Sequence, residues 1–218
     1  MHLSELRREI GQATLVAVSK YQSVEAIKIL YEQGQRAFGE SRATELAEKH
    51  AALPTDIEWH FIGHLQTNKV RQVLPLLTCI QSVDSEKLLQ LIAQEAAQIN
   101  RKIDVLLQVK IAQEDSKYGF DAQSITELAK KIQKATQNGE KTFEYVRFIG
   151  IMGMASNTSD EKQVKNEFLH LKSIFDTLKT NFFTENEDFS ELSMGMSGDY
   201  RTAIAAGSTM VRVGSLLF

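Results

Sequence analysis

LVAVSK, residues 15–20, is a run of apolar and small residues that ends in a lysine. Leu15 to Ser19 predict a buried β-strand, and Tyr21-Gln22-Ser23 then opens a helical pattern. Lys20 is therefore expected at the carboxyl end of a buried strand. Partial loss of hydration there would lower the pKa of the amine and let it attack a carbonyl. The alternative is a lysine that only marks where the strand reaches solvent, because lysine side chains are mostly solvated.

The alternation of strand and helix patterns continues along the whole chain. Apolar runs predict strands over residues 14–20, 37–40, 58–63, 78–83, 103–110, 145–152, 191–196 and 210–214. Amphipathic patterns predict helices over residues 4–11, 23–34, 41–51, 68–77, 85–100, 122–137, 158–178 and 200–206. Eight such alternations in one domain predict the α/β class and a single (β/α)8 TIM barrel. The rival is a doubly wound open sheet, but the first strand is followed by no Gly-x-Gly-x-x-Gly and the chain has no Walker-type Gly-Lys-Ser/Thr.

Three of these helices begin at recognisable capping residues. Ser23 is expected to cap the second helix, and Asp84 or Ser85 the fifth. The seventh helix follows Thr158-Ser159-Asp160-Glu161, which has the spacing of a capping box with Thr158 as the first residue.

The composition is that of an ordinary globular protein, with 43% hydrophobic and 24% charged residues and a formal net charge of −3 over 218 residues. This balance, without a Lys/Arg block, argues against nucleic acid as the main partner. The chain has no apolar run of membrane-spanning length and residues 1–10 do not resemble a signal peptide, so the cytoplasm is the expected location. Residues 1–218 are expected to form one domain. The single cysteine, Cys79, excludes an internal disulfide and is expected in the core.

Chemistry in a barrel of this kind lies where the strands end at their carboxyl side. The polar or glycine residues expected there are Lys20, Glu40, Gly63, Asp84, Lys110, Gly153, Ser197 and Ser215. Two late stretches look suited to a phosphate: residues 193–199, which run from a strand into a helix start, and residues 211–215 after the last strand. Their small residues expose backbone N–H groups that could bind the phosphate. The alternative is that the two stretches are only tight turns, which use the same small residues. Asp199 is expected to cap the following helix rather than to bind a metal.

Arg212 is the unusual residue of an otherwise apolar strand. An unpaired buried charge is costly, so Arg212 is expected either to pair with a carboxylate such as Glu40 or to face a ring nitrogen of a ligand. Lys110 also ends a strand and is a second candidate amine. His60 and His64 are read as polar rim or core residues rather than metal ligands. The loop 114–117 is a solvated turn or a lid over the barrel mouth.

Three features together suggest pyridoxal 5'-phosphate (PLP) as the cofactor. They are a lysine able to attack a carbonyl, two loops suited to a phosphate and an arginine on a strand. Its aldehyde would form a Schiff base with Lys20, and its phosphate would lie at Ser197 and Gly214-Ser215. Arg212 would approach its pyridine nitrogen.

Seven segments of the chain, in order, carry a family resemblance. They are LVAVSK at 15–20, FGE at 38–40, HFIG with LQTNK at 60–69, SKYG at 116–119, GIM at 150–152, LSMGMS at 192–197 and AIAAGSTMVRVG at 203–214. In these segments the sequence resembles the YggS/PROSC family, the pyridoxal phosphate homeostasis proteins. The resemblance implies a barrel like the N-terminal domain of alanine racemase, with the cofactor on Lys20. It also implies an unprotonated pyridine nitrogen at Arg212, which suits cofactor storage, or at most racemase-like chemistry, better than transamination.

Four residues depart from the usual family pattern. Ser41 stands where Asn is usual, Thr44 for Gln, His64 for Pro and Lys110 for Asn. Lys110 is the departure expected to touch the pocket. The residues expected to bind the cofactor are Lys20, Ser41, Met196, Ser197, Arg212, Gly214 and Ser215, and no metal is expected.

Three functions fit these residues. The first is a monomeric PLP carrier without robust turnover, which buffers the cofactor or passes it to PLP-dependent apoenzymes. The second is an amino-acid racemase, which needs two bases. Racemases of this fold take the second, a tyrosine, from an additional β-domain for which this chain leaves no length. The third is a scaffold without cofactor, which the presence of Lys20, Ser197 and Arg212 argues against.

Overall fold

Eight parallel strands close into a barrel in the computed structural model, which describes residues 1–112 and 118–218. The strands are β1 (Thr14–Val18), β2 (Ala37–Glu40), β3 (Glu58–Phe61), β4 (Cys79–Val83), β5 (Ile103–Val109), β6 (Val146–Gly153), β7 (Glu191–Ser193) and β8 (Met210–Val213). Each strand pairs with the next one in the chain, and β1 pairs with β8 to close the ring. The expected (β/α)8 barrel is confirmed, and the doubly wound open sheet is wrong.

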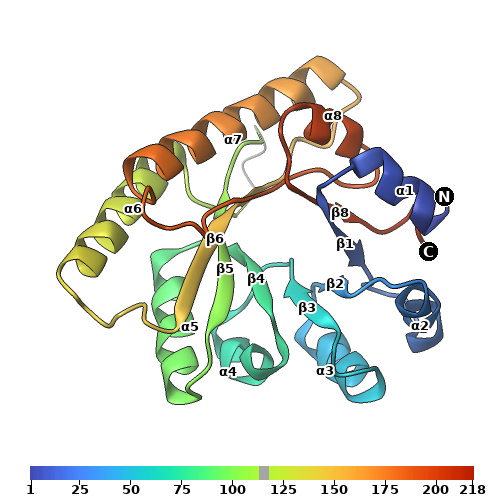
Figure 1. Ribbon diagram of the computed structural model, residues 1–218, viewed down its shortest axis with the longest axis horizontal. Helices are drawn as coiled ribbons and strands as arrows, with labels where there is room; N and C mark the ends of the chain where they lie inside the picture. Colours follow the sequence, from blue (N-terminus) through green and yellow to red (C-terminus); the bar gives the residue numbers. More distant parts are fainter. Residues whose placement is uncertain (113–117) are drawn as a thin grey trace.

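Helices cover the outside of the barrel (Figure 1). They are α1 (Leu3–Ile10), α2 (Val24–Glu32), α3 (Ala43–Ala52), α4 (Val70–Val73), α5 (Glu86–Gln98), α6 (Ala122–Gln137), α7 (Glu161–Asn181) and α8 (Tyr200–Ala205), with short 3-10 turns η1 (Thr67–Lys69) and η2 (Leu74–Leu76) beside α4. The helix expected over 68–77 is thus divided into three short pieces. Pro75, which lies in η2, has no N–H to donate and so cannot continue the α-helical bonding of α4. No helix in the described ranges is long and apolar enough to cross a membrane.

The helix caps follow the sequence in two cases and differ in the third. Ser23 accepts a hydrogen bond from Ala26 N at 3.2 Å, and Ser85 accepts one from Leu88 N at 3.3 Å. For α7 the capping box at Thr158 is wrong. Asp160 is the cap, and its carboxylate accepts from two N–H groups of the first turn. A charged acceptor that serves two donors stabilises the helix start more than one hydroxyl does.

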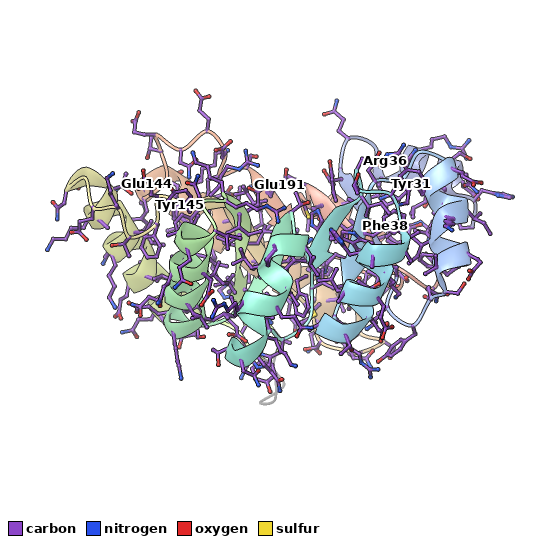
Figure 2. All side chains as sticks on the ribbon, turned by 90° about the horizontal axis from the view of Figure 1, so that it is seen from below. Tyr31, Arg36, Phe38, Glu144, Tyr145 and Glu191 are labelled. Carbon is purple, nitrogen blue, oxygen red and sulfur yellow. The ribbon has the colours of Figure 1, made fainter. Side chains whose placement is uncertain are left out.

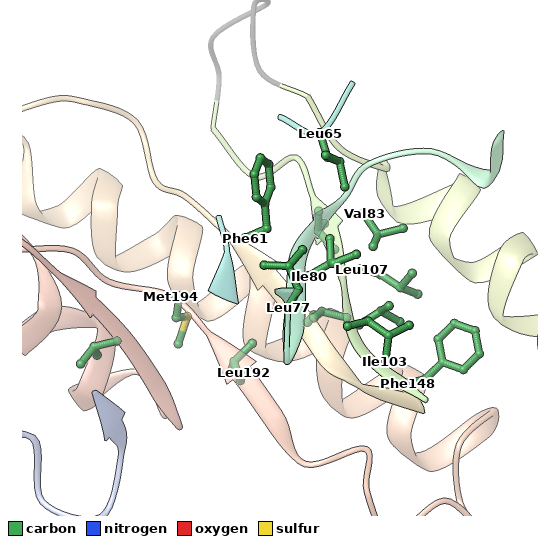
Figure 3. Close-up of a cluster of buried hydrophobic side chains, with 14 of the residues drawn as sticks. Phe61, Leu65, Leu77, Ile80, Val83, Ile103, Leu107, Phe148, Leu192 and Met194 are labelled. Atoms are coloured by element: carbon green, nitrogen blue, oxygen red, sulfur yellow. The ribbon is translucent and has the colours of Figure 1, made fainter. Parts of the chain in front are cut away.

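The hydrophobic core has two parts, one on each face of the strands. The larger part fills the space between the barrel and the helices, and Figure 3 shows Phe61, Ile80, Leu107 and Leu192 within it. The smaller part lies inside the barrel and consists of Val16, Ala37, Cys79, Leu106, Ile149, Met152 and Met210. Both faces are apolar because a covered parallel sheet exposes neither of them. Cys79 is buried and free, as expected.

Five strands end before the last residue predicted for them, and the ends of β1 and β7 bear on the site. β1 ends at Val18, so Lys20 lies in the loop beyond the strand. β7 ends at Ser193, because Gly195 takes a φ of 97° and turns the chain. A Cβ at Gly195 would come within 2.6 Å of the Ala203 Cβ, so only glycine fits this turn.

The two ends of the barrel are distinct. Figure 2 shows Arg36, Tyr145 and Glu191 at one end, where β2, β6 and β7 begin. The carboxyl ends of the parallel strands therefore meet at the opposite end. The chain termini lie close together beside β1 and β8 (Figure 1), and the amino group of Met1 donates to Leu216 O at 3.0 Å.

Candidate functional site

A cavity of about 530 Å³ opens at the carboxyl end of the barrel strands. Its lining contains all seven residues that the sequence nominates for cofactor binding, namely Lys20, Ser41, Met196, Ser197, Arg212, Gly214 and Ser215. The structure thus brings residues from both ends of the chain to one place. The lining also contains Ile62, Gly63, His64, Gln108, Tyr118 and Met154, of which Gln108 and Met154 lie outside the segments that carry the family resemblance.

Lys20 lies at the mouth of this cavity. It is exposed, so the burial that was expected to dehydrate its amine is not observed. The residue before it, Ser19, is fully buried, and Tyr21 after it has a φ of 65°. Residues other than glycine adopt this left-handed conformation uncommonly, so the turn that carries Lys20 is held by its surroundings.

The two expected phosphate loops meet at the cavity. Ser197 Oγ accepts a hydrogen bond from Gly214 N at 3.2 Å, which links the loop after β7 to the end of β8. A Cβ at Gly214 would lie 3.1 Å from Val18 O, so the absence of a side chain lets β8 approach β1 closely. Asp199 does not cap α8 as expected. Its carboxylate accepts from Met196 N at 2.6 Å and so holds the loop between them.

Arg212 enters the barrel interior with an exposed fraction of only 3%. Its Nη1 donates to Ser193 Oγ at 2.5 Å and its Nη2 to Gly153 O at 3.1 Å. The expected pairing with Glu40 is wrong, because Glu40 faces α3 and pairs there with Lys49. Within residues 1–112 and 118–218, Arg212 forms no ion pair with a carboxylate. Burial lowers its pKa from 12.5 to about 10, which still leaves the guanidinium charged at neutral pH.

A chain of buried hydrogen bonds continues from Arg212 into the barrel. Ser193 Oγ donates to Gln81 Oε1 at 2.7 Å, and Gln81 Nε2 contacts His60 Nδ1 at 2.9 Å. Because a guanidinium only donates, Ser193 must accept from Arg212 and give its own proton to Gln81. The amide of Gln81 then donates to His60 Nδ1, so the proton of a neutral His60 is on Nε2. Nothing in the sequence pattern of Gln81 or Ser193 indicates this arrangement.

The rim of the cavity agrees with the expectation at His64 and differs from it at Lys110. His64 Nδ1 lies 2.7 Å from Asp84 Oδ2, and its ring stacks on Tyr118 at 4.1 Å between centroids. His64 is therefore a rim residue, as expected. Lys110 is not among the lining residues, so the expectation that this departure touches the pocket is wrong. Its backbone N–H donates to Phe120 O at 2.9 Å.

The described residues contain no group of three or more His, Cys, Asp or Glu side chains that could hold a metal ion. The possible lid over residues 114–117 lies outside the described residues.

Comparison with known proteins finds relatives of this chain in sequence and in structure. A family model described as alanine racemase, N-terminal domain, matches residues 2–218. A protein of Helicobacter pylori named pyridoxal phosphate homeostasis protein is 37% identical over 206 residues, which cover 94% of this chain and 86% of the relative.

Solved structures show the same fold. PipY of Synechococcus elongatus without PLP has a TM-score of 0.90 and 32% identity, and covers 99% of this chain and 97% of its own. The same protein with PLP bound has a TM-score of 0.85 and 31% identity, with the same coverage. An alanine racemase of Clostridium difficile has a TM-score of 0.70, covers all of this chain and is matched over 56% of its own length. At 16% identity, this last likeness concerns the fold alone.

His60 makes the stability of the fold depend on pH. Burial lowers its pKa from 6.5 to about 4, so between these values the unfolded chain binds a proton that the folded chain does not. Lowering the pH from 7 to 5 should therefore reduce the free energy of unfolding by about 2 kcal/mol through this residue. His60→Gln cannot titrate and should lose less stability over the same interval, as measured by urea unfolding at both pH values.

The comparison between the two proteins isolates His60. Glu40 and Glu191 have pKa values raised by burial, which gives the opposite dependence, but both residues are present in both proteins. An equal loss of stability in wild type and variant between pH 7 and 5 would contradict the assignment.

Proposed function

Because the chain belongs to the alanine racemase N-terminal-domain family, and within it to the pyridoxal phosphate homeostasis proteins, we propose that it binds PLP reversibly and buffers or supplies the cofactor. The observation that carries this proposal is the convergence of Lys20, Arg212 and the Ser197–Gly214 loops on one cavity. We assign residues 1–218 to a single PLP-binding barrel domain. The recipients in this proposal are PLP-dependent apoenzymes, and the protein acts as a monomer.

The residues of the cavity fit the chemical groups of PLP. The ligand has an aldehyde, an aromatic ring with one nitrogen and a phosphate, and these need an amine, a hydrogen-bond donor and an anion site. Lys20 supplies the amine and Arg212 the donor. Ser197, Gly214 and Ser215 supply a hydroxyl and backbone N–H groups for the anion. A cavity of about 530 Å³ is in the size range of small-molecule sites.

Lys20 is the proposed attachment point. PLP supplies an aldehyde that forms a Schiff base with a primary amine. Lys20 would hold the cofactor through its Nζ, and the aldehyde would supply Schiff-base chemistry there with release of water. The exposed position of Lys20 at the cavity mouth leaves this bond open to water. Access of water permits hydrolysis, which a protein that gives its cofactor away requires.

Arg212 fixes the electronic character of the bound ring. With a pKa of about 10 the guanidinium keeps all its protons at neutral pH, so a ring nitrogen beside it must accept a hydrogen bond. A ring nitrogen that accepts from arginine stays unprotonated, which makes the ring a weak sink for electrons. The contacts to Ser193 Oγ and Gly153 O use two of the five N–H donors of Arg212. This arrangement favours holding the cofactor over catalysis with it.

Removal of the amine tests the attachment point. We expect Lys20→Ala to abolish the visible absorbance band that appears when PLP is added, and to leave no adduct after borohydride reduction. Lys110→Ala is the matched control, since Lys110 also follows a strand but does not line the cavity. It should give the wild-type band and an adduct mapped to Lys20. An adduct on Lys110 in the wild type would overturn the assignment.

Removal of the guanidinium tests recognition of the ring. We expect Arg212→Ala to keep the adduct on Lys20 but to weaken PLP binding by roughly 10- to 100-fold, the usual value of a hydrogen bond to a charged group. Arg147→Ala is the control, because Arg147 pairs with Asp104 on the outside of the barrel at 2.6 Å. Its PLP affinity should equal that of the wild type. Unchanged affinity in Arg212→Ala, measured by fluorescence titration, would remove Arg212 from the site.

Amino-acid racemisation is the second candidate function, and Tyr118 is the observation that favours it. Tyr118 lines the same cavity as Lys20, so two groups able to exchange protons face one space. We expect the PLP-loaded protein to form no D-alanine from L-alanine above the background of free PLP. Formation of D-alanine that is lost in Tyr118→Phe would establish the racemase instead.

A further inference from the structure

The turn that carries Lys20 is held by side chains from other elements. Gln22 N donates to Ser19 O at 3.0 Å and closes the turn, with Lys20 and Tyr21 at its two central positions. Tyr21 has the left-handed φ of 65°, which an isolated turn would populate rarely with this residue. The conformation therefore depends on contacts made by its neighbours.

Lys49 is the centre of these contacts. It lies on α3 with an exposed fraction of only 6%, which is unusual for a lysine. Its Nζ donates to Ser19 O and to Glu40 Oε1, each at 2.8 Å, and to Glu45 Oε2 at 3.3 Å. An ammonium has three N–H donors, and all three have an acceptor here.

The two glutamates that Lys49 contacts also accept hydrogen bonds from the residues on either side of Lys20. Glu40 Oε1 accepts from Ser19 Oγ at 2.6 Å, on the amino side of Lys20. Glu45 Oε2 accepts from Tyr21 N at 2.9 Å, on its carboxyl side. Lys49, Glu40 and Glu45 therefore form a clamp on the turn, and we use this name for the three residues below.

The charges make the clamp a single unit. Glu40 is fully buried, and burial raises the pKa of its carboxyl group, while the hydrogen bonds from Lys49 and Ser19 act in the opposite direction. Among the residues that the structure describes, its second oxygen, Oε2, finds no hydrogen-bond partner. Without the ammonium of Lys49, a buried carboxylate would remain with a single hydroxyl as partner, so Glu40 could not stay charged in this place.

We propose that Lys49 is a positioning residue, which acts through Glu40, Glu45 and the Ser19–Gln22 turn to aim the Lys20 amine into the cavity. This inference rests on the proposed function, because it concerns the amine that receives the aldehyde. The clamp is built from β2 and α3, whereas the ring and phosphate contacts come from β8 and the loop after β7. Loss of the clamp should therefore impair covalent attachment and leave recognition of ring and phosphate intact.

Two ligands separate these effects. PLP reports attachment, whereas pyridoxine 5'-phosphate has the same ring and phosphate but no aldehyde, so it reports non-covalent binding alone. The variants are Lys49→Met, which keeps the length of the apolar stem, and Glu45→Ala, which removes the acceptor of Tyr21 N and the weaker contact to Lys49 but leaves the Lys49–Glu40 pair in place. Glu45 is partly exposed, so its loss leaves a folded protein even if Lys49→Met does not fold. Lys131→Met is the control, since Lys131 forms a 2.8 Å ion pair with Glu86 and neither residue lines the cavity.

The expected result is a split between the two ligands. Lys49→Met and Glu45→Ala should attach PLP to Lys20 at least about tenfold more slowly than wild type, measured by stopped-flow absorbance, because the amine samples more positions. Their affinity for pyridoxine 5'-phosphate should stay within about twofold of the wild-type value, and Lys131→Met should match the wild type in both assays. Unchanged attachment, or an equal loss for both ligands, would overturn the positioning role.

A measurement without any cofactor keeps this inference apart from the proposed function. Amide hydrogen exchange at Tyr21 should be faster in Lys49→Met and Glu45→Ala than in the wild type, because the bond to Glu45 is weakened or lost. Equal exchange in all proteins would overturn the clamp. A wild-type protein that binds neither ligand would overturn the proposed function, and the exchange comparison would still decide whether the clamp orders the turn.

Discussion

Parallel pairing around a closed ring is the constraint on which this structure depends. Each strand runs in the same direction as its neighbours, so all eight carboxyl ends meet at one end of the barrel. The loops after β1, β7 and β8 then face each other although they lie at opposite ends of the sequence. The helices cover the outside, and the core between them and the barrel is built from residues of both helices and strands. The cavity is the place that this arrangement leaves for polar side chains.

The barrel interior changes from apolar to polar toward that cavity. Val16 and Met210 lie in the inner apolar cluster, while Arg212, two residues after Met210 on the same strand, reaches the cavity. The hydrogen bonds from Arg212 through Ser193 and Gln81 to His60 satisfy polar groups that would otherwise be costly to bury. The direction of donation starts at the guanidinium, so one permanent charge orders the whole chain. This series of hydrogen bonds and the clamp on Lys20 reach the same cavity from different strands and helices.

The sequence predicted the barrel from local patterns, and it predicted the seven lining residues from local patterns together with the family resemblance. Strand ends, glycines and small polar residues mark the site in order along the chain. The sequence could not predict the partners of Arg212. Glu40 was a reasonable candidate for an ion pair with Arg212, but in the structure it pairs with Lys49 of α3. Gln81, Ser193 and Lys49 have no distinctive spacing, and their contacts join elements far apart in sequence. The cap of α7 was missed for a local reason, because Asp160 lies two residues after Thr158 and accepts from the N–H groups of Lys162 and Gln163, so the helix begins later.

The pairing of β1 with β8 also sets when the site exists during synthesis. Val16 lies opposite Arg212 in this pairing, so the strands that carry Lys20 and Arg212 are neighbours across the seam of the ring. The ribosome releases β1 first and β8 last, and a contact of such long sequence separation forms late in folding. An incomplete chain therefore lacks the guanidinium, the last phosphate loop and the wall beside Lys20. Only a closed barrel brings Lys20, Arg212 and the loop after β8 together at one cavity.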